Sequence, residues 1–164
     1  MKYLTISLFV LLFSCKPSEK AATNEKPTVK EAVIDFTIIK EGTNSGFTEF
    51  KESLITKQAD LSETWNNIFA NYMQKDPLPK IDFKTNEVYL IAMGEKTSGG
   101  YTIKVESVVE SKKEIIINVV KSIPGKSCMT TSVMTYPYQL IMFQKKDKPV
   151  RFNGIDKVYE CGKE

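Results

Sequence analysis

The run VYLIAM, Val88 to Met93, is continuously apolar and has the length of one strand. It predicts a central strand with both faces covered, because a half-exposed strand alternates apolar and polar residues. Alternation appears before it at Ile34, Phe36 and Ile38, and after it from Tyr101 to Val109. These two segments therefore predict strands with one solvated face.

The second half of the chain is rich in strand signals. Residues 114–120 are dense in β-branched side chains, and the polar residues 110–113 before them predict a hairpin turn. Val133 to Gln144 predicts another strand, in which Pro137 marks an edge or a bulge because proline cannot donate to a ladder. Two short strands are expected near Val150–Phe152 and Lys157–Tyr159.

One amphipathic helix is expected next to these strands. Its apolar stripe recurs at helical spacing and comprises Leu61, Trp65, Ile68, Phe69, Tyr72 and Met73. Asp60 is placed to cap its start, Trp65 to anchor it in the core, and Pro77 and Pro79 to prevent its continuation. The sequence thus predicts an α+β or mainly β domain, an antiparallel sheet or β-sandwich with this helix packed on it.

The first fifteen residues predict a lipoprotein signal peptide. After Met1-Lys2, the apolar run Leu4 to Phe13 is too short for a membrane span. It ends in LFSC, which resembles the bacterial lipobox, so Cys15 is expected to become the first mature residue and to carry diacylglyceryl and palmitate-type chains. Several such chains give stable anchoring. An ordinary secretory signal with Cys15 incidental, or an uncleaved anchor, stays open.

Residues 16–32 are nearly free of large apolar side chains and predict a flexible tether. Lys16 stands where an aspartate would retain a lipoprotein in the inner membrane, which favours the outer membrane, on either its periplasmic or its surface face. The predicted organisation is a signal peptide at 1–14, a lipidated cysteine and tether at 15–32, and one β-rich domain at 33–164.

The amino-acid composition excludes several kinds of catalytic and binding site. The 164 residues include no histidine, which removes Ser-His-Asp and Cys-His catalysis and histidine-based zinc sites. The net charge is only +3, from 23 basic and 20 acidic residues that are evenly scattered, so no nucleic-acid footprint is visible. We therefore expect a non-catalytic binding protein with no cofactor, no metal site and no nucleic-acid partner.

Two loops are the candidate partner-binding sites. The first contains Thr97, Ser98, Gly99, Gly100 and Tyr101, where the two glycines permit close approach to the backbone. The second contains Pro137 and Tyr138, a rigid aromatic anchor in the functional interpretation. The structural alternatives are a tight hairpin and a strand bulge.

The two cysteines that follow Cys15 are candidates for a disulfide. Cys128 and Cys161 form an even pair in a domain expected to be exported into an oxidising environment. Either they form a disulfide that fixes the C-terminus to the loop at 124–129, or they are two separate buried thiols. Sequence alone does not supply the geometry that a bridge requires.

Together these residues resemble a known family, the PrcB C-terminal domain family. The resemblance rests on GEKTSGGY at 94–101, Pro124-Gly125, Thr135 with Pro137-Tyr138, and LPKIDF at 78–83, and it covers roughly residues 60–146. The family takes its name from a lipoprotein subunit that supports assembly and stability of a surface serine-protease complex. The resemblance implies an accessory or assembly subunit that binds another protein in the cell envelope, and it leaves open whether that protein is a protease.

Two other functions stay open. Chagasin-type inhibitors of cysteine proteases are β-sandwiches with a Thr-Gly-aromatic loop beside a Pro-aromatic loop, and residues 97–101 with Pro137-Tyr138 look similar in order and type. The extra glycine, and the lack of an arginine before Pro137 and a tryptophan after it, depart from that pattern. The third function is a small-molecule or glycan binder that uses Tyr101, Tyr136 and Tyr138.

Overall fold

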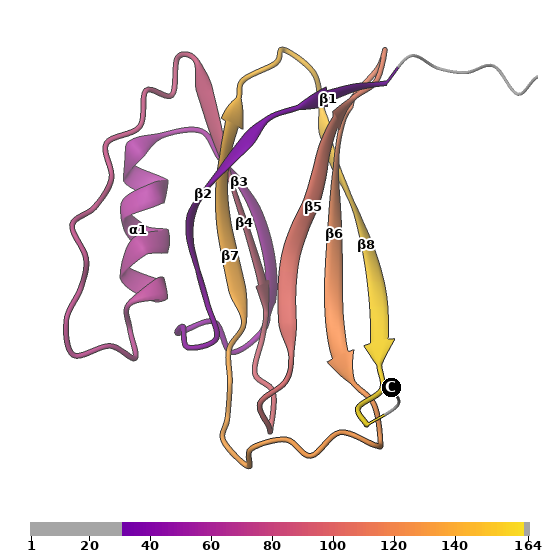
Figure 1. Ribbon diagram of the computed structural model, residues 1–164. Helices are drawn as coiled ribbons and strands as arrows, with labels where there is room; N and C mark the ends of the chain where they lie inside the picture. Colours follow the sequence, from indigo (N-terminus) through magenta and orange to yellow (C-terminus); the bar gives the residue numbers. More distant parts are fainter. Residues whose placement is uncertain (1–30, 163–164) are drawn as a thin grey trace, which may run out of the picture.

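The computed structural model describes residues 31–162, which form three layers (Figure 1). Two four-stranded sheets face each other, and one helix packs on the outer face of one of them. The helix-side sheet has the strand order β2-β7-β4-β3, and the outer sheet has the order β1-β5-β6-β8. This arrangement confirms the predicted mainly β sandwich with one helix. The elements are β1 (Ala32–Ile34), β2 (Phe36–Gly42), β3 (Phe50–Ile55), α1 (Gln58–Ile68), β4 (Asn86–Met93), β5 (Thr102–Glu110), β6 (Ile115–Pro124), β7 (Tyr138–Gln144) and β8 (Val150–Tyr159).

Strand β4 is the centre of the molecule. It lies between β7 and β3 and runs antiparallel to both. Tyr89 and Ile91 face the outer sheet, whereas Leu90 and Ala92 face the helix. Seven of its eight residues are buried. The VYLIAM run is continuously apolar because both of its faces are covered, as its sequence predicts.

The core between the sheets is built from alternate residues of facing strands. Ile103 of β5 and Ile117 of β6 pack with Ile141 and Phe143 of β7. Burial of each such side chain stabilises the fold by about 1.5–3 kcal/mol. The hairpin between β5 and β6 turns at residues 111–114, where the Ser111 side chain accepts hydrogen bonds from following backbone N–H groups. The predicted hairpin is therefore confirmed.

Helix α1 differs from its prediction at both ends. It begins at Gln58 after Lys57, which makes no side-chain capping hydrogen bond, so Asp60 lies within the first turn and does not cap the helix. A carboxylate in the first turn still interacts favourably with the positive end of the helix. The helix ends at Ile68, and Met73, expected in its stripe, is exposed beyond it.

The buried face of α1 follows the predicted stripe up to Phe69. Leu61, Trp65 and Ile68 pack against the helix-side sheet. The Trp65 indole N–H donates to the Asp76 carbonyl oxygen at 2.9 Å, which ties the segment after the helix back to it. Trp65 is thus a core anchor with a satisfied polar atom, as expected.

One side of the sandwich is closed by the chain itself. It passes from β1 in the outer sheet to β2 in the helix-side sheet with only Asp35 between them. Because β1 pairs only with Val108–Glu110, the remaining edge of β5 has no neighbouring strand. There the buried Gln139 side chain accepts a hydrogen bond from the Val105 N–H at 2.6 Å and donates one to Glu41 at 2.6 Å. Gln139 therefore links the two sheets where a strand is missing.

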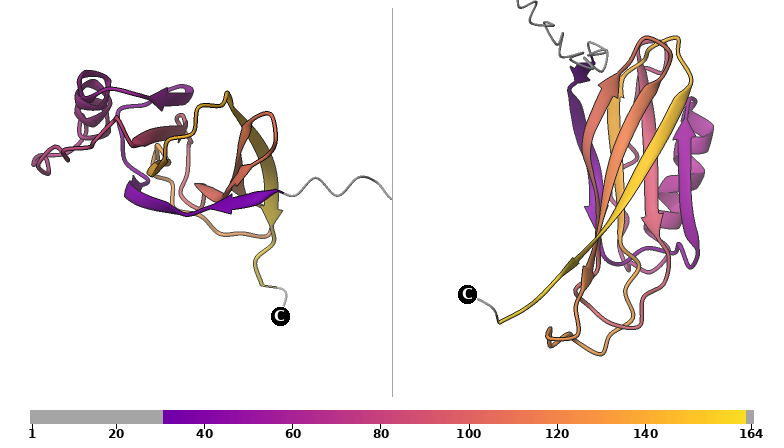
Figure 2. Two further views of the ribbon diagram at one scale, coloured as in Figure 1. Left: turned by 90° about the horizontal axis from the view of Figure 1, so that it is seen from above. Right: turned by 90° about the vertical axis from the view of Figure 1, so that its right-hand side faces the viewer.

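The opposite side is open, with β3 and β8 as the two unpaired edges. Strand β8 runs parallel to β6 along its whole length, as Figure 2 shows in its right-hand view. The sequence predicted two short strands here, which is wrong. The ladder continues through Asn153 and Gly154, because pairing with β6 satisfies the backbone although the side chains are exposed.

Strand β7 begins later than predicted. Residues 133–137 are not part of it, and Thr135 forms only an isolated bridge to Lys96. Pro137 has no N–H to donate, so the regular ladder starts at Tyr138. At the end of β8, Cys161 is bonded to Cys128 in a disulfide.

Candidate functional site

The two candidate loops meet at one end of the sandwich, at the bottom of Figure 1. The segment 94–101 leaves β4 in one sheet and enters β5 in the other, so it is a crossover and not a tight hairpin. It lies against the segment 125–137 between β6 and β7. Lys96 and Thr135 exchange two backbone hydrogen bonds of 2.8 and 2.9 Å, and the Thr135 hydroxyl donates to the Ser98 carbonyl at 2.8 Å. We call these two segments, with residues 160–162, the loop end.

The two glycines of the first loop serve internal packing. Gly100 has a φ of +89°, and a Cβ there would lie 2.9 Å from the Tyr159 hydroxyl oxygen. A Cβ on Gly99 would lie 2.5 Å from Oγ1 of Thr131. The Tyr159 hydroxyl donates to the Gly100 carbonyl at 2.9 Å. The close backbone approach that the glycines permit is thus made by side chains of the same chain.

The second predicted anchor is not at the surface. Pro137 is buried, and Tyr138 is only 1% exposed within the core beneath the helix. Burial also raises the pKa of the Tyr138 phenol. Core packing covers both side chains, so the structure does not present them at the surface for contact with a partner. For the same reason, Pro137-Tyr138 does not form the second exposed loop that the chagasin-like alternative requires.

The remaining predicted residues lie at or near the surface. Thr97 and Gly100 are exposed, while Ser98, Gly99 and Tyr101 are half-buried. The Tyr101 ring packs against the core between the sheets and lines a shallow cavity of about 520 Å³ with Phe50 and Lys121.

Tyr136, a residue of the glycan-binding alternative, is engaged by a neighbouring side chain. Its hydroxyl donates to the Glu95 carboxylate at 3.0 Å. That hydrogen bond raises the pKa of the Tyr136 phenol. With Tyr138 buried, the three tyrosines do not form one aromatic platform.

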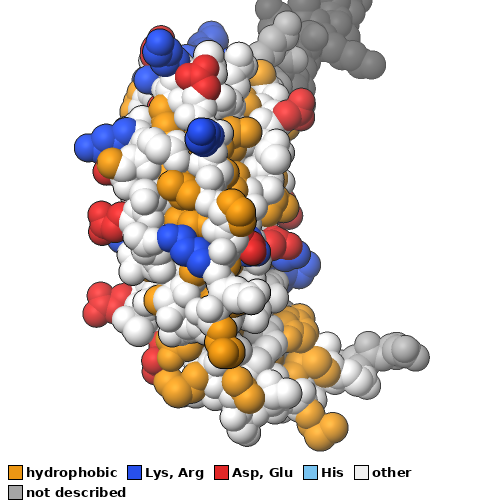
Figure 3. Space-filling model, turned by 90° about the vertical axis from the view of Figure 1, so that its left-hand side faces the viewer, with side chains coloured by type: hydrophobic (Ala, Val, Ile, Leu, Met, Phe, Trp, Pro, Cys, Tyr) orange, Lys and Arg blue, Asp and Glu red, His pale blue; other side chains and the backbone are white. Residues whose placement is uncertain are grey.

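Sequence reasoning missed the most exposed apolar side chains of the loop end. Met129 and Met134 are 101% and 52% exposed, and Val133 between them is exposed as well. Hydrophobic side chains also gather at the lower end of the face in Figure 3. The three side chains lie within residues 129–134 of one loop. Exposed apolar surface marks interaction sites, and methionine adapts its shape to a partner. The available signal was two methionines and a valine within residues 129–135, whose other members are serine and threonine.

The loop that carries these side chains is fixed at its base. The Cys128–Cys161 disulfide joins it to the end of β8, and the Gly125 N–H donates to the Tyr159 carbonyl at 2.8 Å. The Ser127 hydroxyl bonds the Glu160 carboxylate and accepts from the Cys161 N–H at 2.9 Å. A loop ordered in advance loses less conformational entropy on binding.

The described residues offer little for other chemistry. Among residues 31–162 there is no group of three or more His, Cys, Asp or Glu side chains placed to hold a metal ion. No helix in this part of the chain has the length and hydropathy needed to cross a membrane. The predicted signal peptide, Cys15 and most of the tether lie outside the described residues.

Comparison with known proteins gives one finding. No curated protein and no solved structure matches the chain. Residues 88–144, however, match the model of a protein family. The matched segment runs from β4 to β7 and includes both loops of the loop end. This family is described as PrcB C-terminal, and the match confirms the resemblance that the sequence shows over these residues.

Proposed function

We propose that this protein is a lipid-anchored accessory subunit of the bacterial cell envelope that binds a protein partner, a protease complex, through the loop end. The observation that carries the proposal is the exposed apolar group of Met129, Val133 and Met134 on a loop fixed by a disulfide. This group lies within the segment that matches the PrcB C-terminal family, whose name indicates a role associated with a protease complex.

The energetics support a protein partner. Covering a Met or Val side chain on binding is worth at most about 1.5–3 kcal/mol, and the prior fixing of the loop reduces the entropy lost. The residues between Met129 and Val133 in the chain, Thr130 to Ser132, are polar and exposed, as is Thr97 on the other loop. An apolar centre with a polar rim is typical of protein interfaces. A lipid on Cys15 would also hold the domain at the membrane, where a membrane-bound partner is locally concentrated.

The same surface offers no activated nucleophile. The Tyr136 phenol donates to Glu95, and this hydrogen bond raises the pKa of the phenol, which disfavours the phenolate. With no histidine in the sequence, no imidazole base is available either. These observations support binding without catalysis.

The loop-end test is crosslinking in native membranes followed by identification of the captured protein. A triple variant, Met129→Ala with Val133→Ser and Met134→Ala, should reduce stoichiometric capture by at least about tenfold, since interface anchors contribute about 1–4 kcal/mol. The control is Val33→Ser, which removes an exposed aliphatic side chain of β1 at the other end of the sandwich. Equal capture by wild type and the triple variant would place the interface elsewhere.

The anchoring step has its own test. Cells fed a radiolabelled fatty acid should incorporate label into the wild-type protein and not into Cys15→Ser. The same variant should leave the membrane fraction, because a polar tether alone gives no membrane affinity. Label retained in Cys15→Ser would contradict lipidation at this residue.

A further inference from the structure

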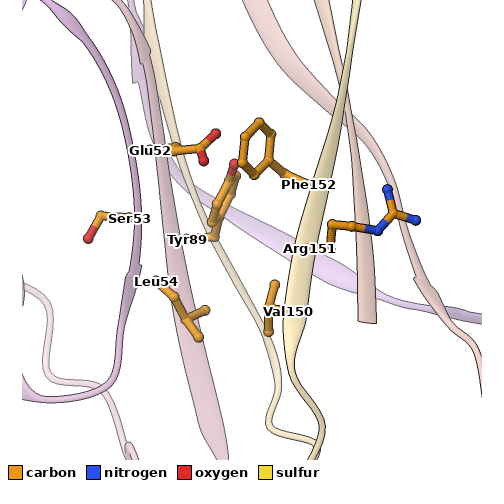
Figure 4. Close-up of a pocket in the computed structure, with 7 residues that line it drawn as sticks. All are labelled: Glu52, Ser53, Leu54, Tyr89, Val150, Arg151 and Phe152. Carbon is orange, nitrogen blue, oxygen red and sulfur yellow. The ribbon is translucent and has the colours of Figure 1, made fainter. Parts of the chain in front are cut away.

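The open side of the sandwich contains a second site, separate from the loop end. Between the edge strands β3 and β8 lies a cavity of about 290 Å³. Glu52 and Leu54 line it from β3, and Val150 and Phe152 line it from β8. Tyr89 of the central strand lies beneath them, as Figure 4 shows. The walls are mainly apolar, and the polar groups are few.

Two of those polar groups lack partners. Tyr89 is 3% exposed, yet its hydroxyl has no hydrogen bond within the described part of the chain. The same holds for Oε2 of Glu52. In Figure 4 the phenol and the carboxylate point into the same space beside the Phe152 ring. A buried polar atom without a hydrogen bond destabilises a fold, so these two atoms indicate a hydrogen-bonding partner from outside the fold.

The cations nearby are engaged elsewhere. Nζ of Lys121 lies 3.5 Å from Asp156 and 4.8 Å from the centre of the Phe50 ring. Nε of Arg151 lies 3.1 Å from Glu114. Among residues 31–162, no lysine or arginine forms a salt bridge with Glu52. Burial raises the pKa of the Glu52 carboxyl, and the charge of Lys121 only partly opposes this.

We infer that this cavity receives the lysine or arginine side chain of an extended partner segment that lies along the open side between β3 and β8. The charged end donates to Oε2 of Glu52 and to the Tyr89 hydroxyl oxygen. The aliphatic stem covers Leu54 and Val150, and the Phe152 ring face attracts the cation. This goes beyond the proposed function, because it involves none of the loop-end residues.

An extended polypeptide suits the site better than a free amine. Both flanking strands are sheet edges whose outer backbone groups have no strand partner among the described residues. Such edges add a strand from another chain, and pockets between alternate side chains then provide specificity. Gly154 lies in the middle of β8, and a Cβ added there would lie 3.9 Å from the end of the Lys121 side chain, in ordinary van der Waals contact. A glycine within a strand often marks a close approach of another backbone.

The first experiment is an NMR titration of the full chain with n-butylammonium, with 1-butanol as the neutral probe. Butylammonium should produce saturable shifts at Tyr89 and Phe152, and butanol should not. Glu52→Gln should weaken the binding by at least about fivefold. Glu106→Gln removes an exposed carboxylate on β5 and is the matched control, expected to bind as wild type does. Equal shifts with both probes, or unchanged affinity in Glu52→Gln, would overturn the inference.

The second experiment tests the extended segment. The probe is acetyl-Thr-Val-Thr-Lys-Thr-Val-Thr-amide, compared with the same peptide carrying norleucine in place of lysine. The lysine peptide should bind about tenfold more tightly and should slow hydrogen exchange of β3 or β8 amides. The triple loop-end variant should bind it normally, so failure here and failure of the proposed function are distinguishable. Equal affinity of the two peptides would refute the cationic pocket.

Discussion

Strands β4 and β8 are held in the fold in opposite ways. Seven of the eight residues of β4 are buried, whereas eight of the ten residues of β8 are exposed. Strand β4 has a neighbour on each side and a layer on each face. Strand β8 has one neighbour and a disulfide just beyond its end. The difference teaches that burial fixes the centre of this domain, while backbone pairing and a covalent bond fix its edge.

The strongest test of that contrast is Leu90→Ala in β4. Leu90 is fully buried between sheet and helix, so its truncation leaves a cavity. The free energy of unfolding should fall by about 3–5 kcal/mol. Denaturant unfolding followed by tryptophan fluorescence measures it, since Trp65 lies in the same cluster. A loss below 1 kcal/mol would show that burial is not what holds β4.

Removal of the disulfide should come next in size. Cys128→Ser with Cys161→Ser opens a loop with a sequence separation of 33 residues, a loss of about 2–4 kcal/mol. Because β8 has little buried surface, hydrogen exchange should quicken in β8 while β4 amides keep their protection. Equal loss of protection in both strands would mean that the bond stabilises the whole domain and not its edge.

A smaller effect is expected at Glu87, the buried carboxyl in β4, whose pKa is raised by burial. A raised pKa means that the folded state holds the proton more tightly. The contribution to stability is therefore full below the ordinary pKa of 4.5 and is lost as the pH rises through the higher folded value. Glu87→Gln should gain stability relative to wild type between pH 4 and pH 7. Urea unfolding of both proteins at both pH values checks this. If the difference in unfolding free energy between Glu87→Gln and wild type were the same at pH 4 and pH 7, the prediction would be contradicted.

The smallest effect is expected in β8 itself. Ile155→Thr changes a side chain that is half exposed, and it keeps the β-branch that suits a strand. The free energy of unfolding should change by about 0.5 kcal/mol or less. The same denaturant assay as for Leu90→Ala gives the comparison directly. A loss near that of Leu90→Ala would remove the contrast between the two strands.

The same contrast explains which parts of the fold the sequence could predict. Strand β4 was predictable because its two covered faces appear as one apolar run, and α1 because its buried face recurs at helical spacing. Strand β8 was broken in two by the prediction, because Asn153 and Gly154 weaken the local pattern while the ladder to β6 depends on residues far away in the chain.

The loop end shows a similar limit. The sequence drew attention to both loops, and the structure places them side by side. The sequence does not indicate that Tyr138 faces the core while Met129 and Met134 face solvent. The orientation of these side chains depends on the residue at which the ladder of β7 begins. The open-side cavity was also beyond prediction. Glu52, Tyr89 and Phe152 come from three strands, and only the packing of the two sheets brings them together.

Parallel pairing of β6 and β8 has a consequence for assembly of the native fold. Two parallel strands finish at the same end of a sheet, so Cys128 after β6 and Cys161 after β8 arrive side by side, with Cα atoms 4.8 Å apart. A slip of β8 by two residues would keep every side chain on its face but carry Cys161 about 6.6 Å along β6. Added to the lateral separation of the two strands, this displacement would place the Cα atoms of Cys128 and Cys161 beyond the reach of a disulfide, which is roughly 7 Å. Side-chain alternation alone does not distinguish the native register of β8 from registers shifted by two residues. Formation of the disulfide therefore selects the native register.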